Sequence, residues 1–239
     1  METFSNVTAA ILAGGLGTRL RSVLGDRPKV LAEVGGRPIL QYLLDQIAYL
    51  EIRRVVLCTG FLGEQIESHF GNSYGSLHLV YSKELSPLGT AGALRLALPL
   101  FQSDSVLVLN GDSYCKADLR SFWSWHCLRR AEATLLLVET SDTGRYGRVE
   151  IDEEGRILKF AEKINEGGRG WINAGIYLLG NRFLQSIPDR YPVSLERDIF
   201  PSWIGGKLYG YKSKGQFLDI GTPESYVLAE EFFTEDIAK

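Results

Sequence analysis

The chain has 239 residues, of which 45% are hydrophobic and 23% charged, and its formal net charge is −3. These values are typical of a globular protein with a sizeable core, and they exclude the basic surface that nucleic-acid binding requires. Three scattered cysteines argue against a disulfide framework, and no apolar run reaches membrane-spanning length. We therefore expect a cytoplasmic protein with neither a nucleic-acid nor a membrane partner.

An apolar run at residues 7–13 predicts a buried strand, which leads directly into Gly14-Gly15-Leu16-Gly17-Thr18-Arg19-Leu20. Glycines after a strand let the backbone approach a ligand, and their N–H groups can hold phosphate. The segment matches neither a Walker A loop nor the dinucleotide fingerprint, which needs a glycine where Leu20 stands. The glycines alone would equally fit an ordinary tight turn. Arg19 and Lys29, which can neutralise phosphate charge, favour a nucleotide site.

The remainder of the first half alternates helical and strand-like segments. Helical spacing of apolar residues predicts helices at 38–50, 64–70 and 90–100, and one capped by Asp118 that carries Phe122, Trp125 and Leu128. Short apolar runs predict strands at 55–59, 77–81, 106–109 and 133–139. Such alternation predicts an α/β fold with a doubly wound, mostly parallel, Rossmann-like sheet, in which ligands bind at the carboxyl ends of the strands.

The second half of the chain contains mostly strand-like segments instead of alternating strands and helices. Residues 148–152 and 156–161 alternate around Glu153-Glu154-Gly155, which predicts a hairpin, and further strands are expected at 171–179 and 207–211 before a helix at 223–233. Trp171 and Trp203 are expected in the core. No linker or repeat divides the chain, so we expect a single domain over 1–239. A nucleotide-binding half (about 1–140) and an acceptor-binding half (about 141–239) would share one mixed sheet.

Two aspartates follow predicted strand ends. Asp112 closes Asn110-Gly111-Asp112, and Asp219 opens Asp219-Ile220-Gly221-Thr222-Pro223. A carboxylate in such a place can bind Mg²⁺, although a turn aspartate, or a helix start with Thr222 as cap, explains each one singly. The two aspartates together with the glycine-rich loop favour a metal–nucleotide site.

Seven motifs follow one another along the chain: Gly14-Gly15-Leu16-Gly17-Thr18-Arg19-Leu20, Pro28-Lys29, Pro87-Leu88-Gly89-Thr90-Ala91-Gly92, Asn110-Gly111-Asp112, Glu162-Lys163, Asn173-Ala174-Gly175 and Asp219-Ile220-Gly221-Thr222-Pro223. In these motifs and their order the chain resembles the sugar-1-phosphate nucleotidylyltransferases, from about residue 7 to 233. It looks most like the short D-glycero-α-D-manno-heptose 1-phosphate guanylyltransferases, in Arg21-Ser22-Val23, in Ser141-Asp142-Thr143-Gly144-Arg145-Tyr146-Gly147 and in Leu195-Glu196-Arg197-Asp198.

The resemblance implies a nucleotide-diphospho-sugar transferase fold, here without the C-terminal β-helix of many relatives, because the chain stops after its last predicted helix. It implies a cytoplasmic, Mg²⁺-dependent enzyme that joins an NTP and a sugar 1-phosphate into an NDP-sugar and pyrophosphate, for bacterial surface polysaccharide synthesis. No catalytic Ser, Cys or His is needed, since the sugar phosphate oxygen attacks the α-phosphorus. A homo-oligomer is compatible with the sequence.

The family's pattern also implies roles for individual residues. Arg19, Lys29, Asp112 and Asp219 would be catalytic, with the two aspartates as Mg²⁺ ligands. The nucleotide would be bound by Leu12, Ala13, Gly14, Gly15, Gly17, Thr18, Glu84, Gly89, Thr90, Asn110 and Gly111. The sugar phosphate would be bound by Gly147, Glu162, Lys163, Asn173, Ala174 and Glu196.

Glu84 suggests which base is bound. In relatives the residue five positions before the glycine of the Gly89-Thr90-Ala91 turn pairs with the base edge, and a Gln there suits uracil or thymine. An ionised Glu84 only accepts hydrogen bonds, and guanine presents two donors side by side, N1–H and N2–H₂. We therefore expect GTP, although a solvated loop glutamate would have the same spacing.

Other readings stay open at this point. Enzymes that use mannose 1-phosphate with GTP, or glucose 1-phosphate with UTP, dTTP or CTP, share the main motifs. A glycosyltransferase would show Asp-x-Asp where this chain has Asp112-Ser113-Tyr114. A non-catalytic nucleotide-sugar-binding regulator would be expected to have lost Arg19, Lys29 or one aspartate, and all are present.

Overall fold

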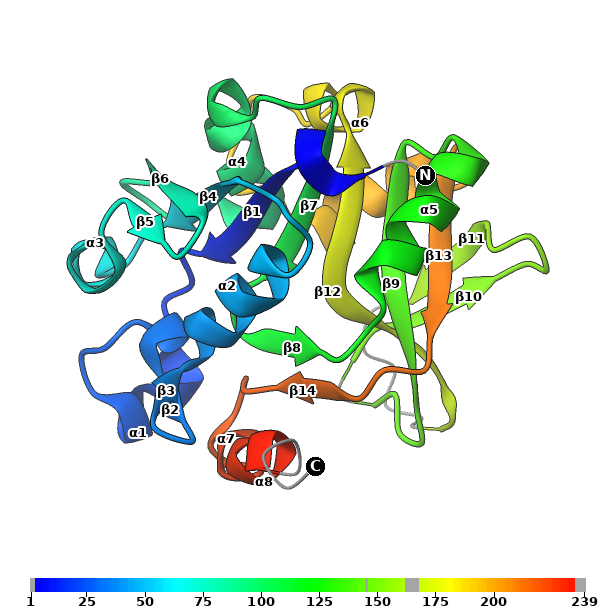
Figure 1. Cartoon of the computed structure of the whole chain (residues 1–239). Helices are drawn as coiled ribbons and strands as arrows, with labels where there is room; N and C mark the ends of the chain where they lie inside the picture. Colours follow the sequence, from blue (N-terminus) through cyan, green and yellow to red (C-terminus); the bar gives the residue numbers. More distant parts are fainter. Residues whose placement is uncertain (1–2, 145, 162–167, 235–239) are drawn as a thin grey trace.

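The structure is a computed structural model that describes residues 3–144, 146–161 and 168–234. At its centre lies β1 (Thr8–Ala13), which pairs in parallel with β4 (Arg54–Thr59) on one side and β7 (Ser105–Asn110) on the other (Figure 1). Next to β4 lies β6 (Leu77–Lys83), also parallel, and then the short β5 (Ser73–Tyr74). The apolar runs that predicted β4 and β7 are buried, as expected for the interior of a parallel sheet, whereas in β6, nearer the sheet edge, only Leu77 and Leu79 of the predicted run are buried.

The sheet continues beyond β7 with strands from the second half of the chain. The long β12 (Gly170–Gly180) runs antiparallel to β7, and β9 (Ala133–Thr140) also pairs antiparallel with β12. Beyond them lie β13 (Leu208–Ser213), parallel to β9, and the predicted hairpin of β10 (Arg148–Ile151) and β11 (Ile157–Ala161). The predicted α/β fold, with one mixed sheet parallel around β1, is therefore confirmed.

Helices cover both faces of the sheet (Figure 1). On one face, apolar side chains of α2 (Ile39–Ala48) and α5 (Leu119–Arg129) pack on strand residues such as Ile11. On the other face, α4 (Gly89–Ala97) and α6 (Asn181–Gln185) pack on residues such as Ala10. Successive strand residues thus point into opposite core layers, as the period of a strand requires. Within the described residues, no helix has the length and apolarity needed to cross a membrane.

Local signals in the sequence placed most of these helices correctly, but the structure corrects the predictions for α5, for α4 and for the last helix of the chain. Asp118 caps α5 as predicted, since its side chain accepts the backbone N–H groups of Arg120 and Ser121 at 3.0 Å each. However, Leu128 is 81% exposed, because the buried face of α5 is formed by Leu119, Phe122, Trp123 and His126. The helix expected to reach residue 100 ends at Ala97, and Leu98–Leu100 form a 3₁₀ turn that contains a proline.

The last predicted helix is two short ones. Thr222 caps α7 (Pro223–Val227), and α8 (Ala229–Thr234) follows it. Val227 and Leu228, at the junction of the two helices, are exposed. Further short elements are α1 (Arg21–Leu24), α3 (Gly63–Phe70) and the strand pairs β2 (Glu33–Val34) with β3 (Arg37–Pro38) and β8 (Ser113–Cys115) with β14 (Phe217–Asp219). A small separate core, which includes Val34, Ile220 and Phe233, joins α8 to β2 and β14.

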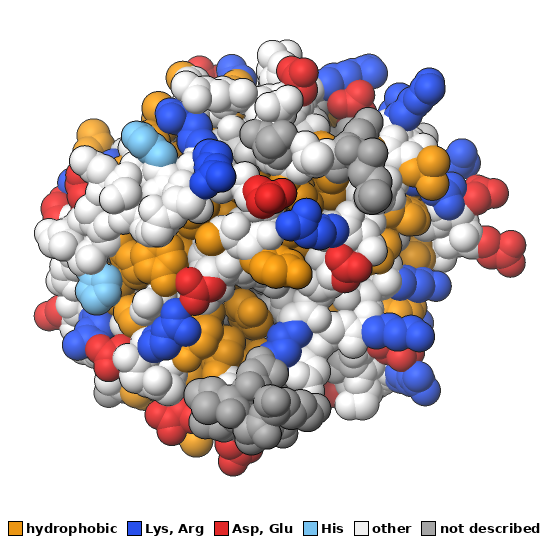
Figure 2. Space-filling model, viewed as in Figure 1, with side chains coloured by type: hydrophobic (Ala, Val, Ile, Leu, Met, Phe, Trp, Pro, Cys, Tyr) orange, Lys and Arg blue, Asp and Glu red, His pale blue; other side chains and the backbone are white. Residues whose placement is uncertain are grey.

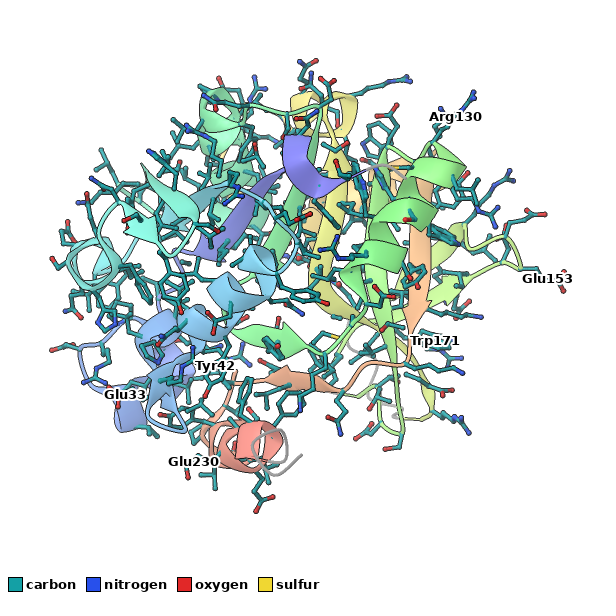
Figure 3. All side chains as sticks on the ribbon, in the orientation of Figure 1. Glu33, Tyr42, Arg130, Glu153, Trp171 and Glu230 are labelled. Atoms are coloured by element: carbon teal, nitrogen blue, oxygen red, sulfur yellow. The ribbon has the colours of Figure 1, made fainter. Side chains whose placement is uncertain are left out.

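Figure 3 shows how the end of the chain meets its beginning. Tyr42 of α2 points toward α8, where its ring stacks on Phe233 at 3.9 Å between centroids. The Tyr226 hydroxyl donates to the backbone oxygen of Glu33 at 2.5 Å. These contacts hold the segment that follows Lys29, and thereby one side of the site described next.

Candidate active site

Three adjoining cavities open at the carboxyl ends of β1 and β7, and Asp112 lines all three. Their volumes are about 280, 260 and 530 Å³, and they are called here the base-side, phosphate-side and acceptor-side cavities. Parallel strands bring their following loops to one edge of the sheet, which is why the loop after residue 13 and the loop after residue 110 meet here. In Figure 2, acidic and basic side chains are interspersed over the face that it presents.

The base-side cavity lies between the glycine loop and the loop that precedes α4. Among its lining residues are most of those expected to bind the nucleotide: Leu12, Ala13, Gly14, Gly15, Glu84, Gly89, Thr90 and Asn110. Glu84 is half-buried, and its Oε2 accepts the N–H of Leu88 at 3.2 Å. Burial raises the pKa of Glu84 above its ordinary value, and the hydrogen bond from Leu88 opposes this shift.

Gly14 lies against the Glu84 carboxylate in this cavity. A Cβ at position 14 would lie 2.7 Å from Glu84 Oε1, so the carboxylate would have to move to accommodate a side chain there. The cavity floor includes Cys58, which is 2% exposed, and burial raises the pKa of its thiol to about 12. The Glu84 carboxylate thus lines a cavity whose walls combine backbone and apolar groups with the charged side chains of Lys29 and Asp112.

The phosphate-side cavity is lined by the glycine loop itself, from Gly15 to Leu20, together with Lys29, Asp112 and Gly221. Gly17 has φ +59°, a conformation that favours glycine, and its oxygen accepts the N–H of Leu20 at 3.0 Å. The Arg19 side chain has no hydrogen bond or ion pair with another residue in the described part of the chain, and it lines this cavity. A guanidinium in this place can bind an anion.

Lys29 and Asp112 form an ion pair inside this cavity, with 2.6 Å between Nζ and Oδ2. The Lys29 side chain is 13% exposed, and the Asp112 side chain is 43% exposed. Because Lys29 is the more buried partner, leaving it without a counter-charge would be costly, so either this carboxylate or a bound phosphate must face it.

The two predicted metal ligands are brought together by the pairing of β8 with β14. Figure 1 shows β8 and β14 side by side, with Asp219 opposite Ser113 in their register. The N–H of Ile220 donates to the backbone oxygen of Asp112 at 3.0 Å, and both aspartates line the acceptor-side cavity. Asp219 Oδ1 also accepts the N–H of Gly221 at 2.7 Å. No group of three or more potential metal ligands occurs among the described residues. A pair of carboxylates nevertheless fits Mg²⁺, which commonly takes one or two of them and completes its shell with phosphate and water.

The acceptor-side cavity contains a buried hydrogen-bond network. Asn173 Oδ1 accepts the N–H of Gly175 at 2.9 Å, and its Nδ2 donates to the hydroxyl of Tyr177 at 2.8 Å. That hydroxyl in turn donates to Glu196 at 3.0 Å. Tyr177 is fully buried, which raises its pKa well above the ordinary value, so its hydroxyl stays a donor to the carboxylate.

Gly175 allows the strand to approach the site closely. Its φ is +72°, and a Cβ there would lie 2.7 Å from Asn110 Nδ2. The glycine that the sequence motif includes is therefore required by the contact between β12 and the end of β7.

Several predicted residues lie elsewhere. Gly111 is buried beneath the site, where its N–H donates to the oxygen of Leu12 at 2.9 Å, and neither it nor Gly147 lines one of the three cavities. Glu162 and Lys163 fall outside the described residues, as does Arg145. Trp171 and Trp203 pack on the core and line none of these cavities.

The acceptor-side cavity also contains residues to which sequence reasoning assigned no role, among them Tyr146, Ser194, Arg197 and Phe217. Tyr146 and Phe217 form an edge-to-face aromatic pair with 5.7 Å between centroids. Ser194 and Arg197 lie close to Glu196 in the chain, so the motif that contains Glu196 could have indicated that they line the same cavity. The aromatic pair joins residues 71 positions apart, and nothing local in the sequence indicates it.

Comparisons with known proteins agree with this geometry. A family model described as "Nucleotidyl transferase" matches residues 8–236. A D-glycero-alpha-D-manno-heptose 1-phosphate guanylyltransferase from Aneurinibacillus thermoaerophilus is 36% identical over 226 residues, which are 93% of this chain and 96% of that protein. A mannose-1-phosphate guanylyltransferase from Mycobacterium tuberculosis is 36% identical over 97% of this chain, which spans only 66% of its length.

A solved structure is also similar. The crystal structure of HddC from Yersinia pseudotuberculosis complexed with GMP-PN superimposes with a TM-score of 0.84 at 32% identity, over 95% of this chain and 99% of that one. The resemblance drawn from the seven motifs is therefore confirmed, and so is the expectation of an enzyme of that family.

Proposed function

Because the chain belongs to the nucleotidyl transferase family, we propose that it transfers the guanylyl group of GTP to a sugar 1-phosphate and releases pyrophosphate. The acceptor that we propose is D-glycero-α-D-manno-heptose 1-phosphate, the substrate in the names of two relatives at 36% and 33% identity. The product would be a GDP-sugar for surface polysaccharide synthesis.

The observation that carries the choice of GTP is Glu84 in the base-side cavity. Its carboxylate accepts one backbone N–H, which leaves lone pairs for the adjacent N1–H and N2–H₂ donors of guanine. Adenine presents a donor beside an acceptor, and uracil presents one donor between two acceptors, so either base would place a carbonyl or ring nitrogen against a carboxylate oxygen.

The reaction requires positioning and neutralisation of charge rather than a protein nucleophile. A phosphate oxygen of the sugar 1-phosphate attacks the α-phosphorus of GTP, and the bond to the bridging oxygen breaks as pyrophosphate leaves. Arg19 and the backbone of the glycine loop would bind the departing pyrophosphate, and Lys29 would turn from Asp112 to the α-phosphate and the attacking oxygen.

Asp112 and Asp219 would hold Mg²⁺, which neutralises charge on the phosphates when it is bound. Glu196 and Asn173 would orient the sugar through its hydroxyl groups. Lys163 is the proposed ligand of the sugar phosphate on the strength of the family motif alone.

Mannose 1-phosphate is the second candidate acceptor, because the mycobacterial relative named for it is equally similar at 36% identity. The decisive experiment is a matrix of GTP, UTP, dTTP, CTP and ATP against the 1-phosphates of the heptose, mannose and glucose, read by pyrophosphate release. The proposal expects the highest kcat/KM for GTP with the heptose compound. Equal turnover of GTP and UTP with one acceptor would refute the choice of base, and a higher kcat/KM with mannose 1-phosphate would replace the proposed acceptor.

A further inference from the structure

The carboxylate of Glu196 has most of its hydrogen-bonding capacity committed within the protein. Its Oε2 accepts from the hydroxyls of Thr90 at 3.0 Å and Ser194 at 2.8 Å, and its Oε1 accepts from Tyr177 at 3.0 Å. A carboxylate has about four lone-pair sites, so roughly one remains, on Oε1. Glu196 lines the acceptor-side cavity, and that remaining site is therefore the one available to a hydroxyl of a bound sugar.

The Thr90 hydroxyl fixes the direction of one of these bonds. It accepts the N–H of Leu195 at 2.8 Å, and it has a single proton to donate. Because a carboxylate only accepts, that proton points at Glu196. Thr90 thus orders both the backbone immediately before Glu196 and the carboxylate itself.

Backbone hydrogen bonds hold the two segments together around this side chain. The oxygen of Val193 accepts the N–H groups of Ala91 at 3.0 Å and Gly92 at 3.3 Å, and its own N–H donates to the oxygen of Leu88 at 2.9 Å. The first turn of α4 is therefore bonded to the segment that carries Glu196. Thr90 adds the side-chain link between them.

We infer that Thr90 is a positioning residue for the acceptor sugar, rather than a nucleotide ligand as its motif suggested. Thr90 lines both the base-side and the acceptor-side cavity, and both polar contacts of its hydroxyl go to the segment that carries Glu196. The inference deepens the proposed function and rests on it, because it assigns Thr90 a role in selecting the sugar through Glu196.

The test compares Thr90→Val, which removes the hydroxyl at nearly constant shape, with Thr90→Ser, which keeps it. Thr90→Val should raise the KM for the sugar 1-phosphate about tenfold, as expected for one hydrogen bond to a charged group, and leave the KM for GTP unchanged. Thr90→Ser should restore the wild-type KM. In a Glu196→Ala background, which offers the Thr90 hydroxyl no acceptor, Thr90→Val should add much less than tenfold.

Thr8→Val is the matched control. Thr8 is 2% exposed, its hydroxyl also accepts one backbone N–H, from Gln102 at 3.3 Å, and it stands at the opposite end of β1 from the glycine loop. It should lower thermal stability without changing either KM. If Thr90→Val fails to fold, Ser194→Ala removes the other donor to Oε2 and carries the same expectation.

Three results would overturn the role of Thr90: a rise in the KM for GTP with the acceptor KM unchanged, a Thr90→Val enzyme that matches wild type, or a Thr90→Ser enzyme as impaired as Thr90→Val. Each presupposes a wild-type enzyme that turns over. Absence of wild-type turnover with every sugar 1-phosphate would contradict the proposed function instead, so the two failures are distinguishable.

Discussion

Replacing Glu84 by Gln should change which base the enzyme prefers. The carboxylate has two acceptor oxygens, one of which already accepts the N–H of Leu88, whereas Gln has one oxygen and one NH₂ group. If the Gln oxygen stays with Leu88, its NH₂ faces the guanine N2–H₂, donor against donor. If it turns to guanine, the N–H of Leu88 loses its acceptor.

Either arrangement loses one hydrogen bond to a charged group and leaves a donor unpaired, which costs about 3 kcal/mol. That corresponds to a fall of roughly 100-fold in kcat/KM for GTP. Burial already disfavours the charged form of Glu84, as the raised pKa of its carboxyl shows, so the neutral Gln should not destabilise the fold. The loss of specific bonding to the base should therefore dominate.

The assay is pyrophosphate release with GTP, UTP and dTTP at one fixed acceptor concentration, with a thermal melt of each protein. We expect Glu84→Gln to lose GTP activity, to gain UTP activity relative to GTP, and to melt at the wild-type temperature. Glu67→Gln, an exposed glutamate of α3, is the matched control and should leave all three rates unchanged. A Glu84→Gln enzyme with wild-type kcat/KM for GTP would refute the reasoning.

Three further outcomes are expected. Asp112→Asn removes a proposed metal ligand and the ion-pair partner of Lys29, so kcat should fall by at least ~100-fold while the circular dichroism spectrum is retained. Full activity of this variant in Mg²⁺ would show that Asp112 is not a metal ligand. Because burial raises the pKa of Glu84, its carboxylate is protonated at a higher pH than that of an exposed glutamate. The KM for GTP should therefore rise as the pH falls below neutral and stay constant at neutral pH and above. A Glu84→Gln enzyme with the same pH profile would assign the titration to another group. Gly89 has φ +77°, and Gly89→Ala would place a Cβ 2.4 Å from the backbone oxygen of Val193. The substitution should lower the free energy of unfolding, measured by urea titration, by more than ~3 kcal/mol. An unchanged urea midpoint would show that the backbone at this position relaxes freely.

The parallel part of the sheet could be predicted from local signals. Buried runs such as residues 106–109, and the helix capped by Asp118, lie where their periodicity and caps placed them. Both kinds of signal act within a few residues, so the sequence carries them directly. The same holds for the glycine loop, whose strand, glycines and cations are consecutive in the chain.

Long-range pairing could not be predicted in this way. Nothing local indicates that β12 inserts between β7 and β10, or that three-residue strands bring Asp112 beside Asp219. The ordered motifs suggested that these aspartates act together, and the structure supplies the pairing of strands by which they meet. The hydrogen bond of Tyr177 to Glu196 joins residues 19 positions apart, and no local pattern indicates it.

The pairing of β14 with β8 also bears on when the protein becomes active during its synthesis. A nascent chain that has emerged only through β13 contains Asp112, the glycine loop and both cations, but it lacks Asp219 and the helices that pack against β2. N-terminal structure forms first as a chain leaves the ribosome. The nucleotide-binding half can therefore assemble before the second carboxylate of the proposed metal site has been synthesised, so under this proposal we expect turnover only after β14 has paired with β8.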